Sequence, residues 1–307
     1  MTVFRLLGPL LLLVSWFSFA SAARAQVNAD AYLVDELIVE QPDGATNHVR
    51  IYGKSTSVGR WVTIIPSLGR GVEDYTEAYR SSLTTKLAEA GYRVVLVQPR
   101  GIGKSSGDLN PERMSMALLA NDLATVFDAI GADRVRLIGH AFGNRLARVF
   151  ATAQPDRVSG LVLVASGGDF ELNAEQRYCL SRSFDLSLER MERLEAIGCA
   201  FFATGNDPSI WFDGWYPKLA AAQIVSATSI KSSEFKAAGG LPFMLIQPGE
   251  DFIAPPDLAG RKLAAELPDQ VTYAEIPIAG HAITSEQPDL VANLIIAYFS
   301  REEVDAN

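Results

Sequence analysis

The chain of 307 residues contains few of the side chains that bind metal ions. It has two cysteines and three histidines, and they are scattered along the sequence. None of them stands in the C-x-x-C or H-E-x-x-H spacing with which proteins commonly hold zinc. We therefore expect neither a metal site nor another cofactor.

The chain also lacks an excess of positive charge. It has 27 lysines and arginines against 36 aspartates and glutamates, which gives a formal net charge of −9. A protein that binds nucleic acid needs a basic surface to meet the phosphates. An acidic chain of this kind is not expected to bind nucleic acid.

Long hydrophobic runs are absent, except at the very beginning. Arg5 precedes an apolar run over residues 6–20, and small residues follow up to Ala25. This is the layout of a secretory signal peptide, so we assign residues 1–25 to one and expect a periplasmic or secreted protein with no membrane span after cleavage. An uncleaved membrane anchor is the alternative, although the run is short for a span and is interrupted by Pro9.

The two cysteines, Cys179 and Cys199, are 20 positions apart. In an oxidising compartment they can close a disulfide loop that would stabilise the fold by roughly 3 kcal/mol. Two buried free thiols are the other interpretation, and the sequence leaves the choice open.

Short runs of apolar and β-branched residues alternate with segments of helical period. Near-continuous apolar strands between helices favour a mostly parallel sheet covered by helices on both faces. An antiparallel hairpin is expected to precede it, with His48 exposed on that hairpin. The expected strands are 61–66, 92–98, 134–139, 160–166, 241–247 and 271–278. The expected helices are 75–91, 116–131, 144–154 and 289–300.

One long segment interrupts this alternation. Residues 167–240 have helical periods and hold ten large aromatic residues, so we interpret them as a helical cap inserted into a core formed by residues 26–166 and 241–307. Most of these aromatics are expected to form the core of the cap itself. The others are expected to contact a small apolar ligand beneath it, and the candidates are Trp211, Phe212 and Trp215.

The stretch "GHAFG", residues 139–143, has the pattern of a sharp turn between a strand and a helix. Gly139 and Gly143 stand where close packing of strand on helix leaves no room for a side chain. The turn resembles the nucleophile elbow G-x-S-x-G of the α/β-hydrolase superfamily, whose central serine attacks the substrate. In this chain the central residue is Ala141, which has no nucleophilic atom.

Two further segments resemble landmarks of the same superfamily. "QPRGIGKSSG" is similar to the turn D-x-R-G-x-G-x-S, with Gln98 in place of the usual acid. "IIPSLGRG" lies where the superfamily has its oxyanion loop, although the usual His-Gly pair is absent. The resemblance implies that the backbone N–H groups of Leu68 and Phe142 are the oxyanion donors.

The resemblance also assigns the remaining members of the catalytic triad. Asp251, in "GEDFIAPP", matches the acid, with Glu250 and Asp169 as competitors. His281, in "IPIAGHAIT", matches the histidine, and His140 is expected to be structural. The order of nucleophile position, acid and histidine along the chain is that of the superfamily.

Without a serine, no acyl-enzyme can form through residue 141, and three interpretations follow. In the first, His281 oriented by Asp251 acts as a base dyad in hydrolysis of a small hydrophobic, ester-like carbonyl compound. In the second, the protein is a catalytically silent binding protein for a small apolar ligand. In the third, the alanine was introduced to trap a substrate. Ser67 is expected to be a turn residue, and the sequence does not indicate the oligomeric state.

Overall fold

The structure is a computed structural model that describes residues 28–57 and 59–305. The predicted signal peptide, residues 1–25, lies outside the described residues. Within the described part of the chain, no helix is long and apolar enough to cross a membrane.

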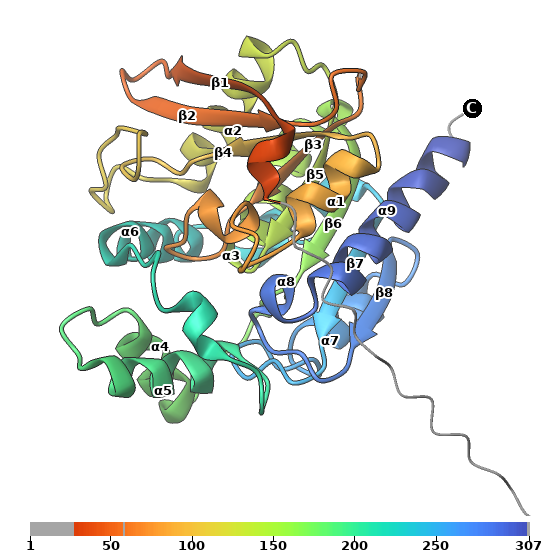
Figure 1. The fold of residues 1–307 in the computed structure, drawn as a ribbon. Coiled ribbons are helices and arrows are strands. Elements are labelled where there is room, and N and C mark those ends of the chain that lie inside the picture. Colours follow the sequence, from red (N-terminus) through yellow and green to blue (C-terminus); the bar gives the residue numbers. More distant parts are fainter. Residues whose placement is uncertain (1–27, 58, 306–307) are drawn as a thin grey trace, which may run out of the picture.

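The centre of the molecule is one sheet of eight strands in the order β1-β2-β4-β3-β5-β6-β7-β8 (Figure 1). The β1–β2 and β2–β4 pairs are antiparallel, and every other pair is parallel. The strands are β1 (Leu33–Glu40), β2 (Thr46–Tyr52), β3 (Trp61–Ile65), β4 (Arg93–Val97), β5 (Val135–His140), β6 (Val158–Val164), β7 (Phe243–Pro248) and β8 (Val271–Ile276). The predicted α/β-hydrolase fold, with a mostly parallel sheet and an antiparallel hairpin at its start, is therefore confirmed.

Helices cover the sheet on both faces. One hydrophobic cluster packs α2 and α3 on one face, and a second packs α1 and α9 on the other. The helices are α1 (Leu83–Glu89), α2 (Met116–Ala129), α3 (Phe142–Ala153), α4 (Ala174–Ser183), α5 (Arg190–Phe201), α6 (Pro217–Thr228), α7 (Gly260–Glu266), α8 (Ile283–Glu286) and α9 (Pro288–Asp305). Because both faces are covered, all six residues of β5 are buried, which explains its apolar run.

The first helix is shorter than its period predicts. We expected a helix over residues 75–91, but α1 begins only at Leu83, and a single 3-10 turn, η2 (Val72–Tyr75), precedes it. The side chain of Asp74 is buried between Arg70 and Arg80, and the buried Tyr75 contacts His140, 65 positions away. These tertiary contacts determine the backbone before Leu83 more strongly than local helical propensity does.

His48 also departs from expectation. It lies on β2 of the hairpin, as predicted, but it is buried, and its Nε2 lies 2.7 Å from a carboxylate oxygen of Glu36. The prediction that His48 is exposed was wrong. Asn47, His48 and Val49 are all buried, so both faces of β2 are covered at this point and neither side of the strand is left exposed.

Between β6 and β7 the chain forms the helices α4, α5 and α6. In Figure 1, α4 and α5 lie side by side, apart from the sheet, whereas α6 lies close to α3. Leu219 and Ala222 of α6 belong to the main hydrophobic cluster beneath the sheet. The part of segment 167–240 that forms its own hydrophobic cluster is therefore centred on α4, α5 and the 3-10 turn η4 (Pro208–Trp211).

A disulfide joins α4 to α5 through Cys179 and Cys199, whose Cα atoms are 5.9 Å apart. The bond closes a loop with a sequence separation of 20. Loop closure of this length is worth roughly 3 kcal/mol of stability. The structure thus contains the disulfide and not two free thiols.

We expect reduction of this disulfide to lower the thermal unfolding midpoint by roughly 6–12 °C, the shift that corresponds to the lost loop-closure term in a chain of this size. The measurement is a thermal melt followed by circular dichroism with and without dithiothreitol. The double variant C179S/C199S is the control, because its midpoint should be low already and should not respond to the reductant. An unchanged midpoint on reduction of the wild-type protein would contradict a stabilising role.

Candidate active site

The predicted catalytic residues all follow strands at one edge of the sheet. β3, β5, β7 and β8 run parallel, so their carboxyl ends lie together. Ala141 follows β5 directly, Asp251 follows β7, and His281 follows β8. In an open α/β sheet this edge is where ligands bind.

Ala141 occupies a strained turn between β5 and α3. Its backbone angles are φ 51° and ψ −108°, which are uncommon for a residue with a Cβ. A Cβ on Gly143 would lie 2.1 Å from the carbonyl oxygen of Ile65, and one on Gly139 would lie 2.6 Å from the Cα of Asn144. The glycines therefore permit the close approach that the tight turn needs, and the turn has the shape of an elbow even though its tip carries only a methyl group.

His281 and Asp251 form a buried dyad. The Nδ1 of His281 lies 2.8 Å from one carboxylate oxygen of Asp251 and 3.0 Å from the other. Because a carboxylate only accepts, the ring carries a proton on Nδ1 and donates it to Asp251. Asp251 is held in turn by the backbone N–H of Ala254, at 2.8 Å. The lone pair of the other ring nitrogen, Nε2, is then free to accept a proton.

The structure shows which of the three candidate carboxylates contacts His281. Glu250 and Asp169 are exposed, and neither contacts His281, whereas Asp251 is buried against the ring. Ser67 is buried in the turn after β3, where its carbonyl oxygen accepts from the N–H of Arg70. Asp251 is thus the carboxylate that orients His281, and Ser67 stands in a turn as expected.

His140 connects the elbow to the histidine loop. Its Nε2 donates to the backbone carbonyl of His281 at 2.9 Å, and its Nδ1 accepts from the hydroxyl of Tyr75 at 2.8 Å. Burial, and after it the neighbouring His281, lowers the pKa of His140 to about 4, so the ring is neutral. Burial raises the pKa of Tyr75, which keeps its hydroxyl protonated as the donor. His140 is therefore a positioning residue, and its contact brings residue 281 next to the elbow.

The predicted oxyanion donors lie on the two sides of the elbow. Phe142 is the first residue of α3, where backbone N–H groups have no acceptor within the helix. Leu68 stands in the turn after β3, which closes with a hydrogen bond from Arg70 to Ser67. The neighbouring N–H of Gly69 donates to Oε1 of Gln223 at 2.7 Å, so α6 fixes this turn.

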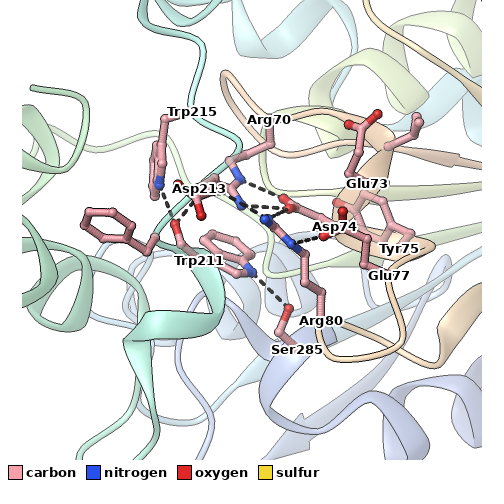
Figure 2. A network of polar contacts seen from close by, with 12 residues as sticks. Arg70, Glu73, Asp74, Tyr75, Glu77, Arg80, Trp211, Asp213, Trp215 and Ser285 are labelled. Atoms are coloured by element: carbon pink, nitrogen blue, oxygen red, sulfur yellow. Dashed lines mark hydrogen bonds and ion pairs between the residues drawn. The ribbon is translucent and has the colours of Figure 1, made fainter. Parts of the chain in front are cut away.

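A buried ion network lies behind the same turn (Figure 2). Arg70 donates twice to Asp74, at 2.7 and 2.6 Å, and Arg80 donates to Asp74 at 2.8 Å. All three side chains are almost completely buried. Two arginines therefore share one carboxylate in the core of the protein.

The network joins the turn to the cap. The guanidinium of Arg70 lies 4.7 Å from the ring centroid of Trp211 and 4.5 Å from that of Trp215, which is the range of a cation–π contact. Arg80 donates to the backbone carbonyl of Asp213 at 3.1 Å. Figure 2 shows Arg70 and Arg80, which stand before and after η2, near the cap segment that carries both tryptophans.

The three aromatics predicted to contact a substrate are packed inside the cap. Trp211 has no exposed surface and donates its indole N–H to the hydroxyl of Ser285 at 2.9 Å. Trp215 is buried beside it, and Phe212 is stacked between the guanidinium groups of Arg190 and Arg193. Their direct contact with a substrate stays a prediction. In the structure they form the core of the cap, as we expected for most of its aromatics.

The cap closes over the dyad. The ring of Phe201, at the end of α5, lies 5.9 Å from the ring of His281, and its backbone carbonyl accepts from the N–H of Ala282 at 2.8 Å. Ala141 is 8% exposed and His281 is 6% exposed. Both residues are therefore almost completely covered in this conformation.

Glu286 fastens the histidine loop to the cap. Its carboxylate accepts from the N–H groups of Ala203 and Gly280, both at 2.7 Å, and from the amide of Asn206 at 2.6 Å. Burial raises the pKa of Glu286 despite these donors. Gly280, the residue before His281, is thus bound to a side chain that also binds the cap.

The residues that the sequence analysis missed are Arg70, Asp74, Tyr75 and Glu286. The first two stand four positions apart, which indicates an ion pair within one turn, but such a pair is usually a surface feature. Nothing in the local sequence shows that the pair is buried or that it faces a cap more than 130 residues later. In the described part of the chain, no group of three or more metal-binding side chains comes together.

Comparison with known proteins agrees with this architecture. A family model described as the alpha/beta hydrolase fold matches residues 61–182. The chain is 28% identical over 248 residues to "Putative carbamate hydrolase RutD" of Klebsiella pneumoniae (strain 342), covering 74% of this chain and 86% of the relative. It is 33% identical over 126 residues to the 2-hydroxy-6-oxononadienedioate/2-hydroxy-6-oxononatrienedioate hydrolase of Paraburkholderia phymatum, covering 41% of this chain and 42% of the relative.

A solved structure extends the likeness over most of the chain. The esterase from Exiguobacterium antarcticum superposes with a TM-score of 0.70 at 16% identity, covering 87% of this chain and 100% of the esterase. At this identity the superposition shows the shared fold alone. Sheet, family model and structural neighbour together show that the chain has the α/β-hydrolase fold, and its sequence is similar to hydrolases of that superfamily, with an alanine at the tip of its elbow.

Proposed function

We propose that the protein hydrolyses a small hydrophobic, ester-like carbonyl compound, with His281 and Asp251 as a base dyad and without a covalent intermediate. The observation that carries the proposal is the intact, buried hydrogen bond between the His281 ring and Asp251 beside the elbow. A base that has lost its serine partner can still act on a water molecule. The methyl group of Ala141 leaves room for that water where a serine hydroxyl would stand.

The proposed reaction has two proton transfers. Nε2 of His281 takes a proton from water while the water oxygen attacks the carbonyl carbon, and Asp251 stabilises the imidazolium. The backbone N–H groups of Leu68 and Phe142 receive the developing oxyanion. Nε2 then returns the proton to the leaving oxygen as the carbon–oxygen bond breaks. A triad without its nucleophile retains roughly 10³–10⁴-fold catalysis over water, which sets the scale of the expected activity.

We place the apolar part of the substrate in a groove next to the acid loop, which none of Ala141, Asp251 and His281 lines. A cavity of about 730 Å³ opens between the end of α5 and the loop that carries the acid, and Phe202 and Phe252 line it. Glu250, the residue before Asp251, stands at its wall. An apolar group placed there would lie next to the loop of the dyad.

We also propose that the protein is exported, because residues 1–25 have the composition of a signal peptide. The disulfide between Cys179 and Cys199 supports this proposal, since such bonds persist mainly in oxidising compartments.

The test of the dyad is the variant His281→Ala. With p-nitrophenyl acetate and butyrate as probes, we expect the wild-type protein to release p-nitrophenolate above the buffer rate and the variant to lose at least about 90% of that excess, because the base is gone. The exposed Asp269→Asn, which precedes β8 and lies outside the groove, is the control and should keep the activity. Equal turnover by wild type and H281A would refute catalysis by the dyad.

A second candidate is a catalytically silent binding protein on the same fold. The packing of Phe201 against His281 favours it, because the closed cap leaves both His281 and Ala141 more than nine-tenths buried. In that case H281A and the wild type would behave alike toward every ester tested. The same pair of proteins therefore separates the two candidates.

A further inference from the structure

A second cavity with unusual electrostatics lies away from the dyad. It has a volume of about 480 Å³ and lies between α3, the end of α6 and the start of α7. None of Ala141, Asp251 and His281 lines it. We call it the arginine cavity, because two arginines of α3, Arg145 and Arg148, form part of its wall.

These two arginines lie on the same face of α3, since they are three positions apart. Arg148 is only 4% exposed, and Arg145 is half-buried. In the described part of the chain, neither forms a salt bridge, although the charge of Asp169 partly offsets the burial that lowers the pKa of Arg145. The hydrogen bonds of both are long: Arg148 Nε donates to the carbonyl of Asn144 at 3.3 Å, and Arg145 Nη1 donates to that of Ala227 at 3.4 Å.

Burying these two positive charges costs free energy of folding unless an anion neutralises them. Burial lowers the pKa of Arg148 to about 9, and the positive charge of Arg145 contributes to this shift. Both effects disfavour the charged form of the guanidinium. A guanidinium nevertheless stays charged at neutral pH. Two like charges on one helix face repel each other, and a buried charge without a partner is expensive. The arginines of the Arg70 and Arg80 network, in contrast, share a buried carboxylate.

The rest of the wall adds positive charge and apolar surface. Lys231 and Lys262 line the cavity, and so does Lys236, which is paired with Glu266 at 2.8 Å. Asp169 is the other acid of the wall, and it is exposed. Cations therefore outnumber acids in this cavity of an acidic chain. Its apolar lining is supplied by Phe170, Ile230, Phe235, Leu258 and Leu263.

We propose that the arginine cavity binds a small organic carboxylate, whose two oxygens accept from Arg145 and Arg148 and whose apolar body lies against Phe170 and Phe235. Guanidinium groups match the geometry of a carboxylate and form strong charge-assisted hydrogen bonds with it. Phe235 already lies against Arg148, with the guanidinium 5.1 Å from the ring centroid. The site does not depend on the proposed hydrolysis, because it shares no residue with the dyad.

The probe is 4-fluorobenzoate, followed by its fluorine NMR signal during titration with the mature protein, in sodium chloride of constant ionic strength. We expect saturable binding to the wild type and at least about tenfold weaker binding to Arg148→Met, because charge-assisted hydrogen bonds of this kind carry about that much affinity. Arg301→Met, which removes an exposed arginine of α9, is the matched control and should bind as the wild type does.

Further variants keep the test decisive. Arg145→Met changes a half-buried residue and should also weaken binding, whatever Arg148→Met does to folding. His281→Ala should bind 4-fluorobenzoate as the wild type does, which separates this site from the dyad. Absence of saturation in the wild type, or equal affinity in all arginine variants, would overturn the proposal. Binding of inorganic phosphate in place of 4-fluorobenzoate would overturn the carboxylate assignment.

Discussion

Replacing Ala141 with serine is expected to raise the hydrolysis of p-nitrophenyl acetate by about 10²–10³-fold and to produce a burst of p-nitrophenolate. The elbow already has the backbone of a nucleophile turn, with φ 51° and ψ −108° at residue 141. The His281–Asp251 hydrogen bond that would activate a serine is in place. The expected gain is a fraction of the roughly 10⁶-fold that a nucleophile and its base contribute together in an optimised protease.

The gain is limited because the cap covers the site and the oxyanion turn lacks the usual His-Gly pair. Stopped-flow absorbance measures the burst, and its amplitude should approach one product per protein molecule. The double variant A141S/H281A is the control and should show no burst. A folded A141S protein without a burst would mean that His281 does not reach the tip of the elbow.

Replacing Asp74 with alanine is expected to destabilise the protein by about 3–5 kcal/mol, the usual effect of removing one partner from a buried ion pair. Asp74 is the one carboxylate that accepts from both Arg70 and Arg80 in the core (Figure 2). Burial by itself would lower the pKa of Arg80, and the charge of Asp74 is the main contribution that raises it above its ordinary value. Without Asp74, two buried guanidinium groups would face each other.

Urea unfolding followed by circular dichroism measures this change, and the thermal midpoint should fall by about 10 °C. The control is Asp108→Ala, which breaks an exposed ion pair with Arg113 and should change stability by less than about 1 kcal/mol. Similar small changes in both variants would show that the buried network contributes little to the fold.

The network also affects how the cap behaves. It contacts Trp211, Trp215 and the carbonyl of Asp213 in the cap while it stands directly behind the turn of Leu68. Movement of the cap away from the dyad therefore requires Arg70 to lose its contacts with both tryptophans. Arg70 therefore links the turn that carries a predicted oxyanion donor to the cap that covers the dyad.

The sequence alone predicted the sheet and the elbow, and its resemblance to the α/β-hydrolase superfamily implied a carboxylate–histidine pair with Asp251 as the first candidate. Apolar runs with the period of buried strands, glycines where a turn must be tight and motifs that follow strand ends are local signals. α2 begins at Met116 as its period predicts, because Ser115 caps it by accepting from the N–H of Leu118.

Only the tertiary structure decided which polar residues are buried and what they contact. The choice of Asp251 over Glu250 depends on a contact across 30 positions of the chain. The ion network around Asp74 is local in sequence, but its contacts with the cap cross more than 130 positions. The closed cap and the unpaired charge of Arg148 have the same origin. Burial and charge pairing depend on distances between such segments, and a pattern that repeats over a few residues carries no information about those distances.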